Sequence, residues 1–352
     1  MCAARSSDPL TVIPDKHDAP MISQTAALLI TICFAVAYVA PFYLSKNLRI
    51  SDHVSRNSAD SIRARSRAVF ITSILCFAFT VVVQSLVGGV SPNESFRCMG
   101  LFPVSSTDLV KSMLLICILF AGPLFEQGFV AGDWRSWLRW RTIRAEVYDD
   151  WIGWRNFVVG PVSEEFIFRS LSISLFLNAL LTEIQTPGPK IVVRAPLLFG
   201  VAHLHHLNEF IISHKRRDQS YLSALATPRI IIPGLVRTLF QLGFTSVFGM
   251  LVTFIFLRTG NVYSCILAHI FCNWMGLPRV WGRLGESVAA DALSSEDHTH
   301  SRQVPIVTPA ARTYSHGTQW TIAYYVLLFS GAVGFWKLLY PLTESSHRLT
   351  DI

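Results

Sequence analysis

Residues 160–169 read GPVSEEFIFR and place two adjacent carboxylates and a guanidinium in an otherwise apolar stretch. On a helix, residues four apart share a face, so we expect Glu165 and Arg169 to pair and to offset the cost of burying each charge. Glu164 points about 100° away from that pair. A carboxylate in an apolar setting can take a proton from water as a general base. A structural ion-pair network between packed helices is the alternative interpretation of the same three residues.

Two further apolar stretches carry polar groups at the same spacing. LLFGVAHLHH places Phe199 and His203 four apart, and SCILAHIFCNW places His269 and Asn273 four apart. At a rise of about 1.5 Å per residue from the ends of their helices, Glu164, His203, His269 and Asn273 are expected at depths in the same half of a bilayer. Glutamate with a neutral imidazole can activate a water, while a second imidazole and an amide can stabilise a developing oxyanion. This combination predicts one cavity that hydrolyses amide bonds without a covalent nucleophile.

These residues lie in a chain with the composition of a membrane protein. Of its 352 residues, 51% are hydrophobic and 15% are charged, whereas a soluble protein carries about 25% charged residues. Apolar stretches long enough to cross a bilayer suggest about eight transmembrane helices in an all-α, polytopic fold. The expected spans are 22–44, 67–90, 108–130, 156–181, 190–208, 230–257, 261–277 and 319–341.

The net charge of +7 is concentrated in alternate loops. The loops 45–67, 131–155, 209–229 and 278–318 are rich in Lys and Arg, which makes their side cytosolic by the positive-inside rule. Both termini would then face the lumen, and the cavity would open to the cytosolic side. Residues 134–151 interleave aromatics with arginines, which favours an interfacial helix on membrane lipid over a nucleic-acid partner.

The chain is expected to comprise four segments. Residues 1–153 hold N-terminal transmembrane helices, basic loops and the interfacial helix. Residues 154–277 form a catalytic core that carries the three motifs. Residues 278–318 form a cytosolic loop with a polar, disordered composition. Residues 319–352 supply the last transmembrane helix and a tail.

The cysteines suggest no metal or redox site. Five of the seven fall within apolar spans without CxxC or zinc-ligand spacing, and are expected to be small buried hydrophobic residues. They are Cys33, Cys76, Cys117, Cys265 and Cys272. No cofactor is expected.

Two other functions remain open. A zinc-dependent membrane protease could use His203, His205, His206 and His269 with Glu164, although the sequence lacks HExxH and His203 and His205 would point about 200° apart on a helix. A transporter or scaffold could also place charges inside a membrane, although such proteins often contain inverted repeats, and none is visible in this sequence.

Together the three motifs resemble those of the membrane-embedded CAAX proteases and bacteriocin-processing enzymes. The motifs of that family are EExxxR, FxxxH and HxxxN, and they occur here at 164–169, 199–203 and 269–273. The strings RNFVVGPVSEEFIFRS and FGVAHLHH are similar to those of the eukaryotic type II CAAX prenyl endopeptidases. The resemblance covers about 154–277 and departs from the family at no motif position.

The resemblance implies an intramembrane glutamate protease of the endoplasmic reticulum. Such enzymes remove the last three residues from farnesylated or geranylgeranylated CAAX proteins, among them Ras-like small GTPases. By this resemblance Glu164 and His203 activate the water, and His269 and Asn273 form the oxyanion site. Glu165 and Arg169 support them, and neither a metal nor a cofactor takes part.

Overall fold

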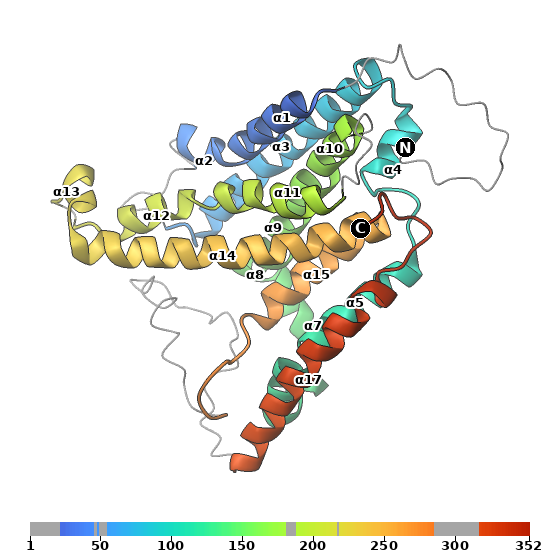
Figure 1. Ribbon diagram of the computed structural model, residues 1–352. Coiled ribbons are helices and arrows are strands. Elements are labelled where there is room, and N and C mark those ends of the chain that lie inside the picture. The colour runs from blue at the N-terminus through green and yellow to red at the C-terminus, as the bar shows by residue number, and fades with distance from the viewer. Residues whose placement is uncertain (1–21, 46–47, 49–54, 181–187, 217, 285–316) are drawn as a thin grey trace. The chain divides into compact units, whose positions relative to one another are not determined.

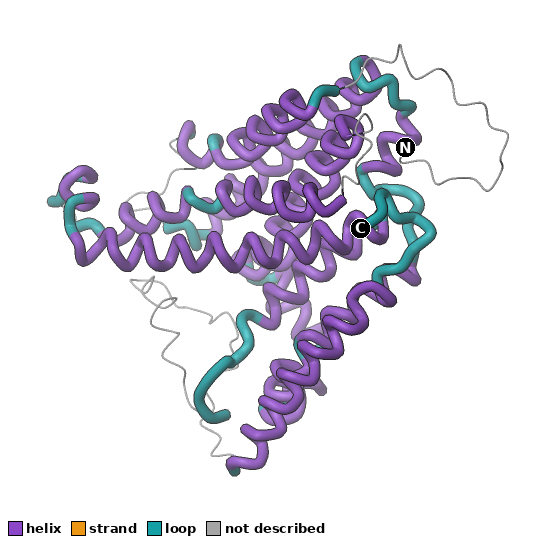
Figure 2. The backbone as a smooth tube through the Cα atoms, viewed as in Figure 1, coloured by secondary structure: helices purple, strands orange, loops and turns teal. Residues whose placement is uncertain are grey.

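The computed structural model describes residues 22–45, 48, 55–180, 188–216, 218–284 and 317–352 (Figure 1). Within these ranges all regular structure is helical and no strand occurs (Figure 2), so the predicted all-α class is confirmed. The chain divides into two compact units and passes between them at 109/110, 159/160, 267/268 and 342/343. The four segments expected from the sequence stay a prediction, because compact units follow spatial contacts and not sequence order.

The first unit contains residues 1–109, 160–267 and 343–352. Figure 1 shows its longest helix, α14, lying along α11 and α12, and α14 contacts both. The helices of this unit are α1 (Gln24–Val39), α2 (Pro41–Leu44), α3 (Ala59–Leu86), α4 (Pro92–Cys98), α9 (Gly160–Glu165), the π-helical segment η5 (Phe166–Leu171), α10 (Ser172–Leu180), α11 (Gly188–Ala202), α12 (His205–His214), α13 (Tyr221–Leu225), α14 (Pro228–Thr259) and the start of α15 (Val262–Met275).

Local signals explain where the long helices of the first unit begin and end. The hydroxyl groups of Ser23 and Ser58 accept hydrogen bonds from the first-turn amides of α1 and α3, as N-cap serines do. Helix α14 ends at Gly260, whose φ of 59° suits glycine. A Cβ at Gly260 would also lie 2.3 Å from the carbonyl oxygen of His347. The glycine therefore both ends α14 and lets residue 347 approach it.

The second unit contains residues 110–159 and 268–342. Helices α5 and α17 run close together, since a Cβ on Gly331 of α17 would lie 2.4 Å from the Ile118 carbonyl oxygen. The helical segments of this unit are most of α5 (Ser106–Leu119), α6 (Ala121–Leu124), η1 (Phe125–Val130), η2 (Asp133–Arg135), α7 (Trp140–Ile143), η3 (Arg144–Tyr148), α8 (Trp151–Trp154), η4 (Arg155–Val159), the end of α15, and α17 (Thr318–Leu342).

Four described helices are long and apolar enough to cross a membrane, or five if the bent pair Ser106–Leu119 and Ala121–Val130, which meet at 81°, counts as one span. They correspond to the expected spans 22–44, 67–90, 230–257, 319–341 and 108–130. The predicted count of eight is not confirmed. The other three expected spans are helical where they are described but consist of shorter helices: α15 has 14 residues, α11 has 15, and 156–180 alternates α-helical and π-helical turns.

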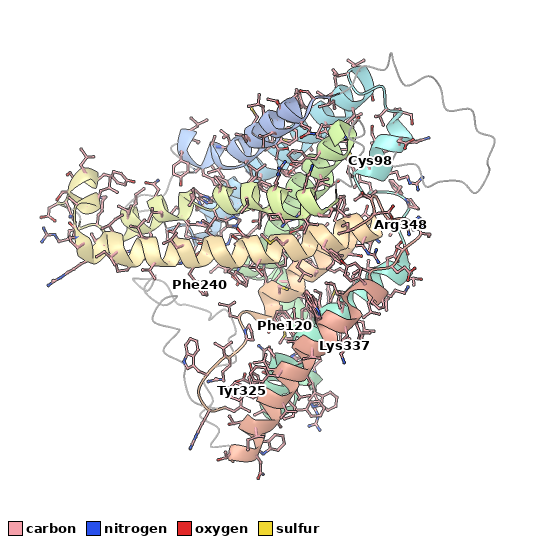
Figure 3. All side chains as sticks on the ribbon, viewed as in Figure 1. Cys98, Phe120, Phe240, Tyr325, Lys337 and Arg348 are labelled. Atoms are coloured by element: carbon pink, nitrogen blue, oxygen red, sulfur yellow. The ribbon has the colours of Figure 1, made fainter. Side chains whose placement is uncertain are left out.

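Large apolar side chains are exposed along the long helices, as a protein in lipid requires. Phe70 on α3, Phe240 on α14 and Trp336 on α17 are 66%, 62% and 76% exposed. Figure 3 marks Phe240 among the side chains of α14. The multi-pass membrane prediction is consistent with this outer surface.

The segment 134–151 differs from the expected single interfacial helix. Arg139, extended at φ −77°, ψ 118°, separates the short segment η2 from α7, which continues directly into η3. The aromatic side chains of the segment are exposed all the same, including Trp134 at 53% and Trp140 at 63%. The residues expected to form a disordered loop lie largely at 285–316, outside the described residues.

The last ten residues pack within the first unit. The Ser345 hydroxyl donates a hydrogen bond of 2.6 Å to the buried carboxylate of Asp108, and the Leu349 amide donates one of 2.8 Å to the Leu257 carbonyl oxygen. The tail is therefore an ordered part of this unit.

The five cysteines of the apolar spans are all free thiols. Cys76 and Cys265 are buried as expected, and Cys117 and Cys272 are partly buried. Cys33 is exposed on α1, which differs from the expectation, because it lies on the outward face of that helix.

Candidate active site

The predicted charged pair is present in the first unit. A nitrogen of Arg169 lies 3.2 Å from a carboxylate oxygen of Glu165, and the two side chains are 1% and 0% exposed. The guanidinium also lies over the Phe199 ring, 4.3 Å from its centroid, which adds a cation–π attraction. The pair begins where α9 passes into the π-helical segment η5, and such turns recur at functional sites.

A glycine of α14 makes room for this arginine. A Cβ on Gly249 would lie 3.1 Å from Nη2 of Arg169 and 2.8 Å from Cβ of Pro196 in α11. Side-chain atoms cannot approach that closely without displacement, so α14 packs here only because residue 249 is glycine. Sequence reasoning missed Gly249, since one glycine in a long apolar helix gives no signal.

Phe199 joins the charged pair to the predicted histidine. The His203 ring lies 4.6 Å from the Phe199 ring, so the expectation that the two share a face is confirmed. Nδ1 of His203 is 2.9 Å from the Phe199 carbonyl oxygen, which can only accept. Nδ1 therefore carries a proton, and in the neutral ring Nε2 holds the lone pair that could receive another. Glu165, Arg169, Phe199 and His203 form one continuous set of contacts.

Glu164 is half-buried, in contrast to the fully buried Glu165. The hydroxyl group of the preceding residue, Ser163, lies 3.0 Å from the Tyr38 hydroxyl of α1, and the Tyr38 ring packs edge-on against Phe168 at 5.9 Å. The separation of Glu164 from the charged pair agrees with the helical argument. Sequence reasoning missed Tyr38, which is far from residue 164 in the chain.

His269 and Asn273 belong to the second unit, on α15. His269 is buried at 7% exposure. The Asn273 side chain is exposed, and its Nδ2 donates to the Asn156 carbonyl oxygen at 2.9 Å. An amide nitrogen carries two hydrogens, so one donor remains for another acceptor. The convergence of these two residues with Glu164 and His203 stays a prediction.

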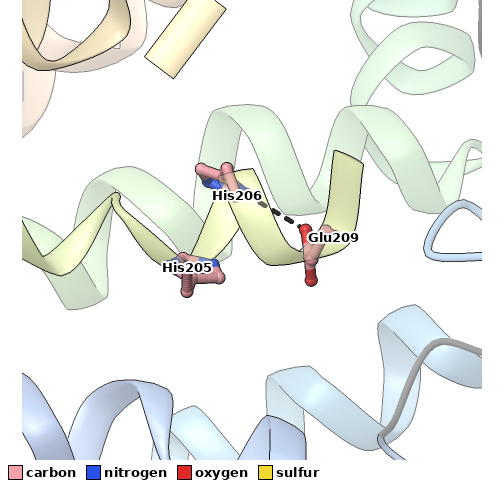
Figure 4. A group of neighbouring side chains, drawn as sticks. All are labelled: His205, His206 and Glu209. Carbon is pink, nitrogen blue, oxygen red and sulfur yellow. Dashed lines mark hydrogen bonds and ion pairs between the residues drawn. The ribbon is translucent and has the colours of Figure 1, made fainter. Parts of the chain in front are cut away.

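One cluster could hold a metal ion among the described residues. The ligand atoms of His205, His206 and Glu209 lie within 4.8 Å of one another on α12 (Figure 4). Arg56 and Arg65 already contact the two Glu209 oxygens at 3.3 and 2.9 Å, however, and His206 contacts one of them at 3.1 Å. Two guanidinium groups beside the carboxylate oppose the approach of a divalent cation.

The electrostatics of Glu209 follow from these contacts. Burial by itself raises the pKa of its carboxyl group, but the hydrogen bond to His206 and the charges of Arg56 and Arg65 hold the pKa well below its usual range. Glu209 is therefore ionised at neutral pH and ties α12 to α3 and the preceding loop.

The fold and the site define a class: a helical multi-pass membrane protein with a buried carboxylate–guanidinium pair that an aromatic ring joins to an imidazole. Residues 149–275 match the family model described as type II CAAX prenyl endopeptidase Rce1-like. The chain is 32% identical to a probable CAAX prenyl protease 2 of Schizosaccharomyces pombe, covering 73% of this chain and 83% of the relative. It is 31% identical to CAAX prenyl protease 2 of Arabidopsis thaliana, covering 74% and 83%.

The human CAAX prenyl protease 2 is 31% identical, with 71% of this chain and 70% of the relative covered. No solved structure matches the chain. The chain belongs to the type II CAAX prenyl endopeptidase family, and it is therefore a membrane protease, as its motifs suggested.

Proposed function

We propose that this chain is an endopeptidase of the endoplasmic reticulum membrane that removes the last three residues from isoprenylated CAAX proteins. The observation that carries the proposal is the contact series from Glu165 through Arg169 and Phe199 to His203. This series lies within the matched family region, and Glu164 is the residue that precedes Glu165 in the chain.

In the proposed reaction Glu164, assisted by His203, takes a proton from a water molecule as its oxygen attacks the scissile carbonyl carbon. The carbonyl oxygen becomes negatively charged, and His269 and the Asn273 amide donate hydrogen bonds to it. When the C–N bond breaks, the proton held by Glu164 passes to the leaving nitrogen. No covalent enzyme intermediate forms, and Glu165 and Arg169 keep the helix in place.

The proposed substrates are farnesylated or geranylgeranylated proteins such as Ras-like small GTPases. Their lipid anchors lie in the cytosolic leaflet, the side to which the basic loops assign the site. Arg135, Arg139 and Arg144 would attract the terminal carboxylate of the substrate or anionic lipid.

The test uses the purified full chain in detergent with a farnesylated CAAX peptide. Release of the C-terminal tripeptide, measured by mass spectrometry, is the expected result. Glu164→Gln should abolish it, whereas Glu94→Gln, at a partly exposed acid on α4, should not. Absence of tripeptide with the unaltered chain contradicts the proposal. Loss on chelation with recovery on added zinc would favour the zinc-dependent alternative.

A further inference from the structure

Two rings of the first unit contact the imidazole of His203. The Phe199 ring packs against it edge-on, with the ring centroids 4.6 Å apart. The His206 ring of α12 lies 5.8 Å from it at an interplanar angle of 57°. Nδ1 of His203 is already used by the Phe199 carbonyl oxygen at 2.9 Å. The orientation of the His203 ring therefore depends on both neighbours.

Each of the two neighbouring rings is itself held by charged groups. The guanidinium of Arg169, which is paired with Glu165, lies 4.3 Å from the centroid of the Phe199 ring. At the other ring, Nδ1 of His206 lies 3.1 Å from a carboxylate oxygen of Glu209, the contact that the dashed line in Figure 4 marks. An ionised carboxylate only accepts, so His206 donates this hydrogen bond.

The carboxylate of Glu209 is fixed in turn by two arginines. Arg65 of α3 lies 2.9 Å from one of its oxygens, and Arg56 lies 3.3 Å from the oxygen that also accepts from His206. Arg65 donates two further hydrogen bonds, of 3.1 and 3.0 Å, to the Leu48 carbonyl oxygen. Both oxygens of Glu209 are therefore engaged, which restricts the carboxylate to one orientation.

We propose that His206 and Glu209 are positioning residues for His203: Glu209 fixes the His206 ring, and that ring restricts the orientation of the His203 imidazole while it assists Glu164. The inference rests on the proposed function of His203. An imidazole assists a water only while its nitrogen is aligned with that water, and a misplacement of about 1 Å can cost on the order of 100-fold in rate. Two separate sets of charges thus act on one imidazole, each through one ring.

The test is a double-mutant cycle on tripeptide release. His206→Ala removes the ring beside His203 and should lower kcat on the order of tenfold with KM unchanged, because it alters the alignment of a catalytic group and not a substrate contact. Glu209→Gln leaves one acceptor oxygen in place of two, which cannot serve both Arg65 and His206. It should lower kcat about threefold. The double variant should be no slower than His206→Ala, because Glu209 acts on His203 only through His206.

His206→Phe separates the packing of the ring from its hydrogen bond. Phenylalanine keeps a ring beside His203 but cannot donate to Glu209, so kcat should fall only as far as in Glu209→Gln. This variant preserves the volume of the side chain, and it carries the test if His206→Ala does not fold. A kcat equal to that of the unaltered protein in both His206→Phe and Glu209→Gln would overturn the positioning role.

Two controls distinguish positioning from stability. Ser345→Ala removes a buried hydrogen bond of the same unit and should lower the unfolding temperature as Glu209→Gln does, yet leave kcat unchanged. His214→Phe replaces another imidazole of α12, stacked on Phe210 at 3.9 Å, and should also leave kcat unchanged. Losses that multiply in the double variant, or a loss of kcat in Ser345→Ala as large as in Glu209→Gln, would overturn the positioning role while leaving the protease intact. An inactive unaltered protein would instead overturn the proposed function, and the positioning role with it.

Discussion

Glu165 and Arg169 are two opposite charges held almost entirely out of solvent. Burying an unpaired ion costs several kcal/mol even after relaxation, and the partner charge offsets this cost only while it is present. The Phe199 ring beneath the guanidinium contributes a further attraction. The turn after Glu164 is thereby fixed by an interaction that depends on both partners.

Removing one charged partner should therefore destabilise the protein far more than removing both. Glu165→Ala is expected to destabilise the protein by about 3–5 kcal/mol, since Arg169 stays buried without its counter-charge. The double variant Glu165→Ala/Arg169→Met should recover part of the loss. Thermal unfolding in detergent measures both.

The control is Asp60→Ala, which breaks an exposed pair with Arg63. Its effect should stay below about 1 kcal/mol, as for other surface pairs. Equal losses of stability in Glu165→Ala and Asp60→Ala would mean that burial of the Glu165–Arg169 pair does not increase its contribution to stability.

The sequence was sufficient for contacts within one helix and insufficient for contacts between helices. The spacing of four residues predicted both the Glu165–Arg169 pair and the Phe199–His203 contact. Tyr38 lies 125 positions from Ser163, and nothing in the residues around either one indicates the other. Such a contact depends on how the helices pack, which the spacing of residues in a single sequence does not predict.

At the scale of elements, the packing of α14 on α11 brings Pro196 and Gly249 together next to Arg169. Alanine favours a helix over glycine by roughly 1 kcal/mol. Replacing a glycine of α14 by alanine should therefore raise the stability of the protein where the added Cβ has space and lower it where the Cβ has none. The helix contains glycines of both kinds.

Gly249→Ala should lower both thermal stability and peptide cleavage, because its Cβ would displace Pro196 and Arg169. Gly243→Ala in the same helix has no atom within 4 Å of the added Cβ, so it should be neutral or slightly stabilising. Unfolding temperature and tripeptide release are measured for each. Indistinguishable behaviour of the two variants would refute the close approach.

A second element, α12, is anchored through Glu209, and its anchoring should depend on pH. Because the folded-state pKa of Glu209 is depressed, the stability that it contributes is present above its unfolded pKa and is lost as pH falls toward the folded value. Glu209→Gln should therefore cost on the order of 1–3 kcal/mol at pH 7. The difference from the unaltered protein should shrink below about pH 4.3.

Unfolding in detergent across a pH series measures this difference. Glu344→Gln, at an exposed acid, supplies the control and should show no such trend. A gap between Glu209→Gln and the unaltered protein that stays constant down to pH 3 would contradict the pairing with Arg56 and Arg65.

Hydropathy predicted the positions of the helices, but the predicted number of transmembrane spans is not confirmed. All eight expected spans are helical, because apolar composition alone favours helices in lipid. Whether a short helix such as α15 crosses the bilayer depends on what surrounds it, and hydropathy carries no such information. The segment 134–151 is not the single helix that its pattern predicts, since the extended backbone at Arg139 divides it.

At the scale of the whole molecule, the tail is part of the first unit through the Ser345–Asp108 hydrogen bond. Ser345→Ala should lower stability by about 1–3 kcal/mol, because Asp108 is 4% exposed and water cannot readily replace the lost donor. Ser330→Ala removes an exposed hydroxyl that bonds within its own helix, and should be neutral. Comparable unfolding temperatures for the two variants would show that the tail contact is dispensable.

The four passages between the two units have a consequence for biosynthesis. A chain whose domains follow one another can fold each as it leaves the ribosome. Here residues 110–159 are translated between two portions of the first unit, and residues 343–352 complete it only at the end. The helices before residue 110 can therefore complete their packing only after residues 160–267 and 343–352 have been synthesised.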